Sequence, residues 1–299
     1  MSRSDKHLAE ALKEYNVKVQ ECEENGTEEQ LLDAYIMRGT VLSMLESYVS
    51  AFTDFDEAID IIDGLKRKGI SVDPGTFVKA YVSRGELQYS EDAGGMAEDY
   101  GIAASRLKEL DENSRYFDWK EIVVMCINCG DDLLYGGFPE GVAPFYGTAE
   151  RMLVDRTDPW SLNRSVDALN IMAKTEQESD RLSASLDYLG RSVNLCRRLM
   201  EENVLEDEMV LVTALILRGD VRLAKDDIEA ALEDYEAVIS VLEIMLEYHR
   251  PEIRELLIET HRDVSGLYTQ TGEVKEAEKH LMKILQLNLC DDLDDSKSV

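Results

Sequence analysis

Two cysteines three residues apart form the clearest chemical motif in this chain. Cys126-Ile-Asn-Cys129 has the spacing of a redox couple and of half a zinc site. A redox couple normally lies at a helix N-terminus after a strand, and a zinc ion needs two further ligands. The remaining cysteines are isolated in the sequence: Cys22, Cys196 and Cys290. We therefore favour a packing role for Cys126 and Cys129, with a thiol-dependent redox or metal-binding protein as the alternative.

The other reactive residue types form no catalytic pattern. The four histidines make no metal-spaced pair: His7, His249, His261 and His280. The glycine-rich segment 136–141 lacks the Lys-Ser/Thr of a phosphate loop and is typical of a turn. The sequence shows no recognisable set of nucleophile, base and acid. It therefore predicts a protein that is not an enzyme and needs neither a cofactor nor a metal.

The composition excludes some classes of binding partner. The 299 residues carry a formal net charge of −30, and 44% of them are hydrophobic, which is enough for a core. This charge repels phosphate, so neither nucleic acid nor an anionic membrane is expected, and a basic partner is favoured. No apolar run approaches the roughly 18–20 residues of a membrane span. Charges interrupt the N-terminal segment, unlike a signal peptide, and five cysteines make no disulfide framework, so we expect a cytoplasmic protein.

A repeated pattern determines which elements would position any site. The segment 34–39 ends in Arg-Gly and returns at 80–85 and 214–219. Each copy is followed, one helix later, by Asp and an aromatic residue. The small residues that close the six copies are 43 to 46 positions apart: Gly39, Gly85, Gly130, Ala173, Gly219 and Ser265. In each unit the second half has one apolar helical face, so the repeat unit is a pair of helices.

The residue pattern resembles the tetratricopeptide repeat, in which a first helix carries Tyr and Gly and a second carries Ala, an aromatic residue and Ala. The first unit matches through Tyr35, Gly39, Ala51, Phe55 and Ala58, and the resemblance covers about residues 30–290. It implies an all-α protein, an α-solenoid forming a right-handed superhelix of about six helix hairpins. The spacings exceed the usual period of about 34, so helices or connections must be longer.

The boundaries follow from this alignment. Residues 1–26 are predicted to form an N-terminal helix that packs on the first repeat, and Thr27 with Gln30 predicts the next helix start. The array spans 27–290, and 291–299 are expected to be an acidic disordered tail. Its units lie near 32–65, 78–111, 123–156, 165–198, 212–245 and 258–288.

Charged residues inside the repeat are predicted to have a structural role. Three units have Arg before the glycine and Asp before the aromatic residue, so we expect the pairs Arg38–Asp54, Arg84–Asp99 and Arg218–Asp234. The fourth unit keeps Asp187 opposite Met172, so this carboxylate must reach water or another partner.

Two columns on the first helices are the candidate ligand-binding residues, because the resemblance implies that these helices line the concave face. Three residues before the small anchor are Ile36, Val82, Ile127, Asn170, Ile216 and Arg262. One residue after it are Thr40, Glu86, Asp131, Lys174, Asp220 and Gly266. The basic groove candidates are Lys79, Lys174 and Arg262. The apolar column either lines the groove or is buried between hairpins, because a shift of one residue decides which face it takes.

These observations favour a non-catalytic scaffold that binds a protein or peptide, basic or amphipathic in character, in the groove of the array. Self-association through the outer face or the N-terminal helix, giving a homo-oligomer, is a second alternative.

Overall fold

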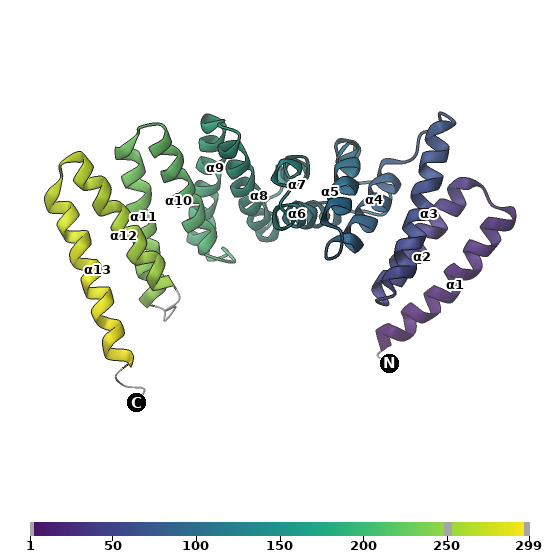
Figure 1. Cartoon of the computed structure of the whole chain (residues 1–299), viewed down its shortest axis with the longest axis horizontal. Coiled ribbons are helices and arrows are strands. Elements are labelled where there is room, and N and C mark those ends of the chain that lie inside the picture. Colours follow the sequence, from purple (N-terminus) through teal and green to yellow (C-terminus); the bar gives the residue numbers. More distant parts are fainter. Residues whose placement is uncertain (1–2, 248–252, 296–299) are drawn as a thin grey trace. The chain divides into compact units, whose positions relative to one another are not determined.

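The computed structural model describes residues 3–247 and 253–295, with side chains described for 6–247 and 253–289. These residues form α-helices, two short 3-10 turns and no β-strand (Figure 1). The helices are α1 (Arg3–Asn25), α2 (Glu28–Met44), α3 (Tyr48–Arg67), α4 (Pro74–Gln88), α5 (Ala93–Ala104), α6 (Trp119–Gly136), α7 (Ala143–Leu153), α8 (Pro159–Glu178), α9 (Leu182–Glu201), α10 (Met209–Ala224), α11 (Ile228–Glu247), α12 (Arg254–Thr271) and α13 (Val274–Asp295).

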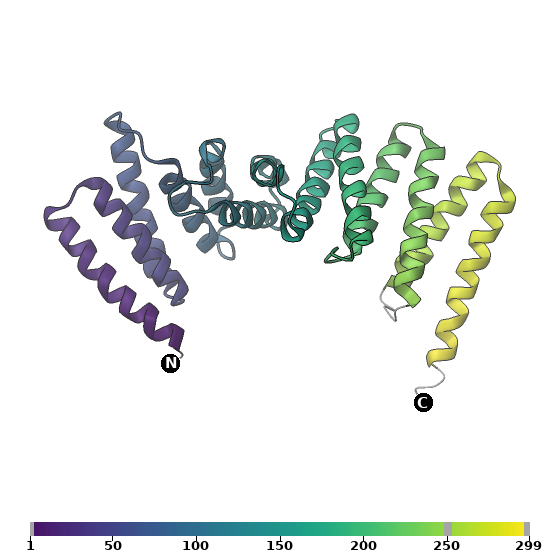
Figure 2. The same ribbon diagram turned by 180° about the vertical axis from the view of Figure 1, so that it is seen from behind.

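Successive helices pair into six hairpins, from α2/α3 to α12/α13, and α1 lies against α2 (Figure 2). Contacts divide the chain into two compact units, Met1–Val154 and Asp155–Val299, where the sequence predicted one array. Within each unit the first helices of neighbouring hairpins touch, α2 with α4 and α8 with α10.

The predicted disordered tail is wrong for residues 291–295, because α13 continues to Asp295. Extending a formed helix costs less than starting one, so an acidic segment can prolong a helix that packing has already nucleated. Residues 296–299 lie outside the described ones, as does His249.

Capping residues set the helix starts. The Thr27 hydroxyl accepts from the Gln30 amide, and the Gln30 side chain accepts in turn from the Thr27 amide, which confirms the predicted capping box. Asp73 and Asp158 cap α4 and α8 by accepting from the backbone amides of Thr76 and Ser161, and each is followed by a proline in the first turn.

The glycine that recurs in the repeat faces the aromatic ring of the second helix in four hairpins. A Cβ added to Gly130 would lie 2.3 Å from the Tyr146 ring, and one added to Gly85 would lie 2.6 Å from Tyr100. The glycine therefore makes room for the ring itself, rather than for a small residue such as Ala51. Ala173 replaces glycine in the fourth hairpin, where Leu189 is the buried residue at the aromatic position and Tyr188 is only half-buried.

The long period has two structural sources. In the first, fourth and fifth hairpins the second helix has 20 residues. In the second and third hairpins the second helix has only 12 and 11 residues. The second hairpin is followed by a long connection, the segment 105–118 between α5 and α6. Both expectations, longer helices and longer connections, therefore apply, in different hairpins.

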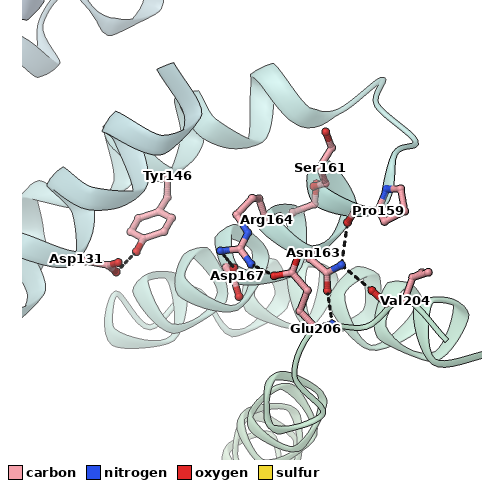
Figure 3. A network of polar contacts seen from close by, with 10 residues as sticks. Asp131, Tyr146, Pro159, Ser161, Asn163, Arg164, Asp167, Val204 and Glu206 are labelled. Atoms are coloured by element: carbon pink, nitrogen blue, oxygen red, sulfur yellow. Dashed lines mark hydrogen bonds and ion pairs between the residues drawn. The ribbon is translucent and has the colours of Figure 1, made fainter. Parts of the chain in front are cut away.

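Polar contacts fix the turn between α9 and α10 onto α8. The Asn163 amide donates to the Pro159 carbonyl at 2.8 Å and to the Val204 carbonyl at 2.9 Å, while its oxygen accepts from the Glu206 amide at 3.0 Å (Figure 3). Arg164 also binds the Glu206 carboxylate. One buried amide thus holds the fourth hairpin and the start of the fifth together.

Candidate functional site

The repeated arginines and aspartates pair across each hairpin. Arg38 donates two hydrogen bonds to Asp54, at 2.8 and 2.7 Å, and Arg84 binds Asp99 with the same two distances. The three aspartates are buried while the arginines are partly exposed. This bidentate geometry is the strong form of a charged hydrogen bond, and it uses two of the five N–H groups of Arg38 and of Arg84.

The third pair has additional support. Asp234 accepts from Arg218 and also from Arg222, whose Nη1 lies 2.8 Å from its Oδ2. The fourth hairpin has no arginine at this place. The predicted position of Asp187 opposite Met172 is wrong, because Leu189 takes the aromatic position, so that Tyr188 corresponds to Asp54, and Asp187 is exposed to solvent.

The apolar column of ligand-binding candidates lies mainly in the core. Ile36 and Val82 are 0% and 2% exposed, so they pack between hairpins and do not line a groove. Asn170 is also buried, where it donates to the Val210 carbonyl at 3.1 Å and accepts from Ser192 at 2.6 Å. Ile127 and Ile216 are half-buried. Of the two arrangements that the sequence left open, burial therefore applies to Ile36, Val82 and Asn170, which are not groove residues.

Two acidic candidates bond within their own hairpin. The Tyr146 hydroxyl donates to Asp131 (Figure 3), and the Tyr235 hydroxyl donates to Asp220. In each pair the tyrosine follows the aspartate by 15 residues. In the first hairpin a phenylalanine replaces the tyrosine, and the equivalent Thr40 donates to the Ile36 carbonyl. The acidic column is therefore partly structural.

Glu86 differs from these two aspartates. Its side chain is exposed, yet the surrounding protein raises the pKa of its carboxyl by desolvation. Asp132 raises this pKa further, and Lys79 opposes the shift. Tyr100, the aromatic residue of the same hairpin, donates to Asp132 in the next hairpin at 2.9 Å.

The basic candidates lie apart from one another along the chain. Lys174 and Arg262 are exposed in the second unit. Lys79 is half-buried in the first unit, with its ammonium 5.9 Å from the centre of the Phe117 ring.

The connection 105–118 covers part of the first helices in the first unit. Arg115 and Tyr116 both bind the Asp33 carboxylate on α2, and the Tyr116 hydroxyl lies 2.6 Å from it. Phe117 is buried beneath Lys79. This segment thus occupies surface that would otherwise be open to a ligand.

The two cysteines are packing residues. Cys126 and Cys129 are fully buried in α6, and burial raises the pKa of both thiols above the ordinary value. A thiolate is the form that reacts and binds metals, so this environment opposes redox or metal chemistry. Among the described residues, no three His, Cys, Asp or Glu side chains gather in a way that could hold a metal ion.

The last hairpin contains a buried pair of histidines that the sequence did not predict. The Nδ1 atoms of His261 and His280 lie 2.9 Å apart, and His280 Nε2 lies 3.1 Å from Glu236. Burial, followed by His280, lowers the pKa of His261 to about 4. The position of His280 in the repeat could have indicated its burial. His280 follows Ser265 by the same interval that separates Gly85 from Tyr100. A histidine thus stands where another hairpin has its aromatic residue.

An open pocket between the start of α3 and the end of α4 was also missed. Its volume is about 700 Å³, and the residues that line it include Tyr48, Val49, Phe52 and Leu87. Val49 is 85% exposed, and Glu86 lies at the same pocket. Nothing in the sequence pattern indicated that Tyr48 and Val49 face solvent.

No protein-family model and no curated protein matches this sequence. Solved structures do match. The apo form of RapI is 13% identical, with a TM-score of 0.53 over 94% of this chain and 76% of that chain. The C-terminal part of a TPR repeat-containing protein from Cytophaga hutchinsonii is 14% identical, with a TM-score of 0.52 over 95% and 92%. Aspartyl phosphate phosphatase F from Bacillus subtilis is 12% identical, with a TM-score of 0.50 over 98% and 76%.

The chain has a tetratricopeptide-type fold. At these identities the likeness shows the fold alone. The tetratricopeptide pattern of glycine facing an aromatic ring is kept in the hairpins that contain Gly39, Gly85, Gly130 and Gly219. The fourth and sixth hairpins change both residues. No described helix is both long and apolar enough to pass through a lipid bilayer.

Proposed function

We propose that this tetratricopeptide-type chain is a non-catalytic scaffold that binds a protein segment in which basic side chains flank an apolar one. The observation that carries the proposal is the pocket between α3 and α4. It brings exposed apolar side chains and carboxylates together in the first unit.

The apolar part of the pocket is unusual for a surface. Tyr48 and Val49 lie in the first turn of α3, and both are exposed. Phe52 and Leu87 are half-buried beside them. Exposed apolar side chains that share a concavity are characteristic of binding sites, because a partner that covers them removes apolar surface from water.

The charged part of the pocket favours a partner segment that carries positive charge. Glu86, Glu91 and Asp92 line it, and all three are exposed. The raised pKa of Glu86 indicates a carboxylate that is solvated less well than usual, so an incoming ammonium or guanidinium group would be favoured there. The net charge of −30 acts in the same direction by attracting a basic segment from a distance.

A location in the cytosol is part of this proposal. The described cysteines Cys22, Cys126, Cys129 and Cys196 are free thiols. A reducing cytosol would keep them so.

A labelled amphipathic Lys/Leu peptide tests the proposal, with the matching Glu/Leu peptide as a control for charge. Val49→Asp is the informative variant, because it removes an apolar contact while adding a negative charge. If the peptide seats its leucines in the pocket, fluorescence anisotropy should show binding about tenfold weaker, as expected for losing one buried apolar side chain. General attraction to an acidic protein predicts tighter binding instead.

Val17→Asp is the matched control, since Val17 is also an exposed valine of the first unit but lies on α1, away from the pocket. It should leave binding unchanged or slightly tighter. Glu91→Lys should weaken binding through repulsion. Equal affinities for Val49→Asp and Val17→Asp would refute the site.

A further inference from the structure

The connection between α5 and α6 contains a segment of turns, residues 111–116, which we call the strap. Two of its side chains bind the same carboxylate on α2. The Arg115 guanidinium contacts Asp33 Oδ2, and the Tyr116 hydroxyl donates to Asp33 Oδ1 at 2.6 Å. The guanidinium also lies 5.5 Å from the centre of the Tyr116 ring. Asp33 therefore holds an arginine and an aromatic residue together, as a binding site for such a pair would.

The backbone of the strap lies directly on α4. A Cβ added to Gly75, in the first turn of this helix, would lie 2.2 Å from the Arg115 carbonyl oxygen. Any other residue at this position would push the strap away, so the close approach requires glycine. Asp33 on α2 and Gly75 on α4 together form the surface to which the strap binds, and we call it the strap-binding surface.

The segments on either side of the strap are held by contacts that do not involve this surface. Before the strap, Leu110 is buried and its carbonyl accepts from Arg151 at 3.2 Å. After the strap, Phe117 is buried and Asp118 caps α6. The strap can therefore leave its binding surface while both flanking segments stay in place.

Two features lower the free energy that is needed to displace the strap. The Arg115 side chain is 54% exposed, and ion pairs that are partly in water stabilise a fold only slightly. Tyr116 has a φ of 70°, in the left-handed region, where a bulky side chain is strained. Because this strain is released when the strap leaves, a competing segment does not have to overcome the whole strength of the contacts.

We propose that the strap is an internal ligand, and that a partner segment in which an arginine precedes an aromatic residue displaces it from the strap-binding surface. The partner would repeat the contacts that Arg115 and Tyr116 make with Asp33, without the strained backbone. The net charge of −30 favours a segment that carries arginine. Neither Asp33 nor Gly75 is among the residues that line the pocket between α3 and α4, so this second surface is independent of the proposed function.

An attached ligand competes at a high effective concentration, so the strap lowers the apparent affinity for a partner that binds the same surface. Arg115→Ala with Tyr116→Ala, which we call the strap variant, removes both competing side chains and keeps Asp33. A labelled peptide with the sequence of residues 113–117, Asn-Ser-Arg-Tyr-Phe, should bind this variant about tenfold more tightly than the wild type in fluorescence anisotropy. The same affinity for both proteins, or no binding to either, would overturn the proposal.

Asp33→Asn in the strap variant tests the site itself. It removes the charge of the carboxylate and should weaken peptide binding about tenfold, as expected for the loss of a charged hydrogen bond. Asp60→Asn is the matched control, because Asp60 is an exposed carboxylate on α3 that belongs neither to the strap-binding surface nor to the pocket. Equal effects of the two substitutions would contradict the proposal. Circular dichroism checks that each variant keeps its helix content.

Proteolysis of the chain with its natural strap tests whether the strap opens. Trypsin takes the arginine side chain into its own acidic pocket, so cleavage after Arg115 requires that this side chain leave Asp33. Asp33→Asn should therefore increase the rate of cleavage between Arg115 and Tyr116 about tenfold, because the rate follows the population of the open form. Asp60→Asn should leave this rate unchanged. An unchanged rate in Asp33→Asn would show that Asp33 does not hold the strap, and the proposal would fail.

Discussion

The arginine–aspartate pairs differ in how much support the aspartate retains, and this makes their contribution measurable. Removing Arg38 leaves the Asp54 carboxylate, whose side chain is 4% exposed, without the two hydrogen bonds that hold it. Removing Arg218 leaves Asp234 in contact with Arg222 at 2.8 Å. The same substitution should therefore be costly in the first hairpin and milder in the fifth.

The expected magnitudes follow from burial. Breaking one side of a buried ion pair costs about 3–5 kcal/mol. The Arg38 side chain is 21% exposed, so we take the lower end of that range, about 3 kcal/mol, for Arg38→Ala. Because Asp234 keeps one arginine, Arg218→Ala should cost about 1–2 kcal/mol. Replacing both members of the first pair, as in Arg38→Met with Asp54→Leu, should cost about 1 kcal/mol or less, since no charge is left buried.

The two tryptophans provide the assay. Trp119 lies on α6 in the first unit and Trp160 lies on α8 in the second, and the chain has no other tryptophan. Urea unfolding followed by fluorescence therefore reports the first unit in a Trp160→Phe background and the second in a Trp119→Phe background. If Arg38→Ala changes the free energy of unfolding by less than about 1 kcal/mol, the structural role of the pair is wrong. If Arg218→Ala costs as much as Arg38→Ala, Arg222 does not compensate for the lost partner of Asp234.

Two further predictions use the same fluorescence assay. Gly130→Ala should destabilise the first unit by about 1–3 kcal/mol, because the new Cβ would lie 2.3 Å from the Tyr146 ring, whereas Gly147→Ala, with nothing within 4 Å, should stabilise it by about 0.5–1 kcal/mol; equal effects would contradict the close approach of the ring. The second unit should lose stability as pH falls from about 6.5 to about 4, because the unfolded chain protonates His261 and the folded one, with its pKa lowered to about 4, does not. The loss should reach at most about 3 kcal/mol, and a pH dependence that persists in His261→Gln would assign it to other groups.

The hairpins could be predicted from the sequence because the two residues in closest contact within a hairpin recur in every well-matched repeat. A glycine is needed wherever the aromatic ring of the second helix lies on the first, so Gly39 and Phe55 recur at a fixed interval. The interval from Arg to Asp equals the interval from Gly to the aromatic residue in the same hairpin, because each arginine precedes the glycine and each aspartate precedes the aromatic residue. Residues that touch within one hairpin can be recognised in this way from spacing alone.

Exposure could not be predicted in the same way. Ile36 and Glu86 lie on first helices at positions only four residues apart in the repeat, yet Ile36 is buried and Glu86 is exposed. Which of the two faces solvent depends on how neighbouring hairpins rotate against each other, and the repeat does not encode that rotation. Val49 was missed for a related reason, because its exposure depends on what α4 leaves uncovered.

One irregularity in the repeat explains why Glu86 is available to a partner. In the third hairpin Tyr146 follows Gly130 by 16 residues, and its hydroxyl binds Asp131, the neighbour of that glycine. In the second hairpin Tyr100 follows Gly85 by 15 residues, and its hydroxyl reaches Asp132 in the next hairpin instead. A shortening by one residue thus moves the tyrosine bond from Glu86 to Asp132. It joins the second hairpin to the third and leaves the glutamate at the edge of the pocket, so the departure from the repeat places a carboxylate where the proposed partner would bind.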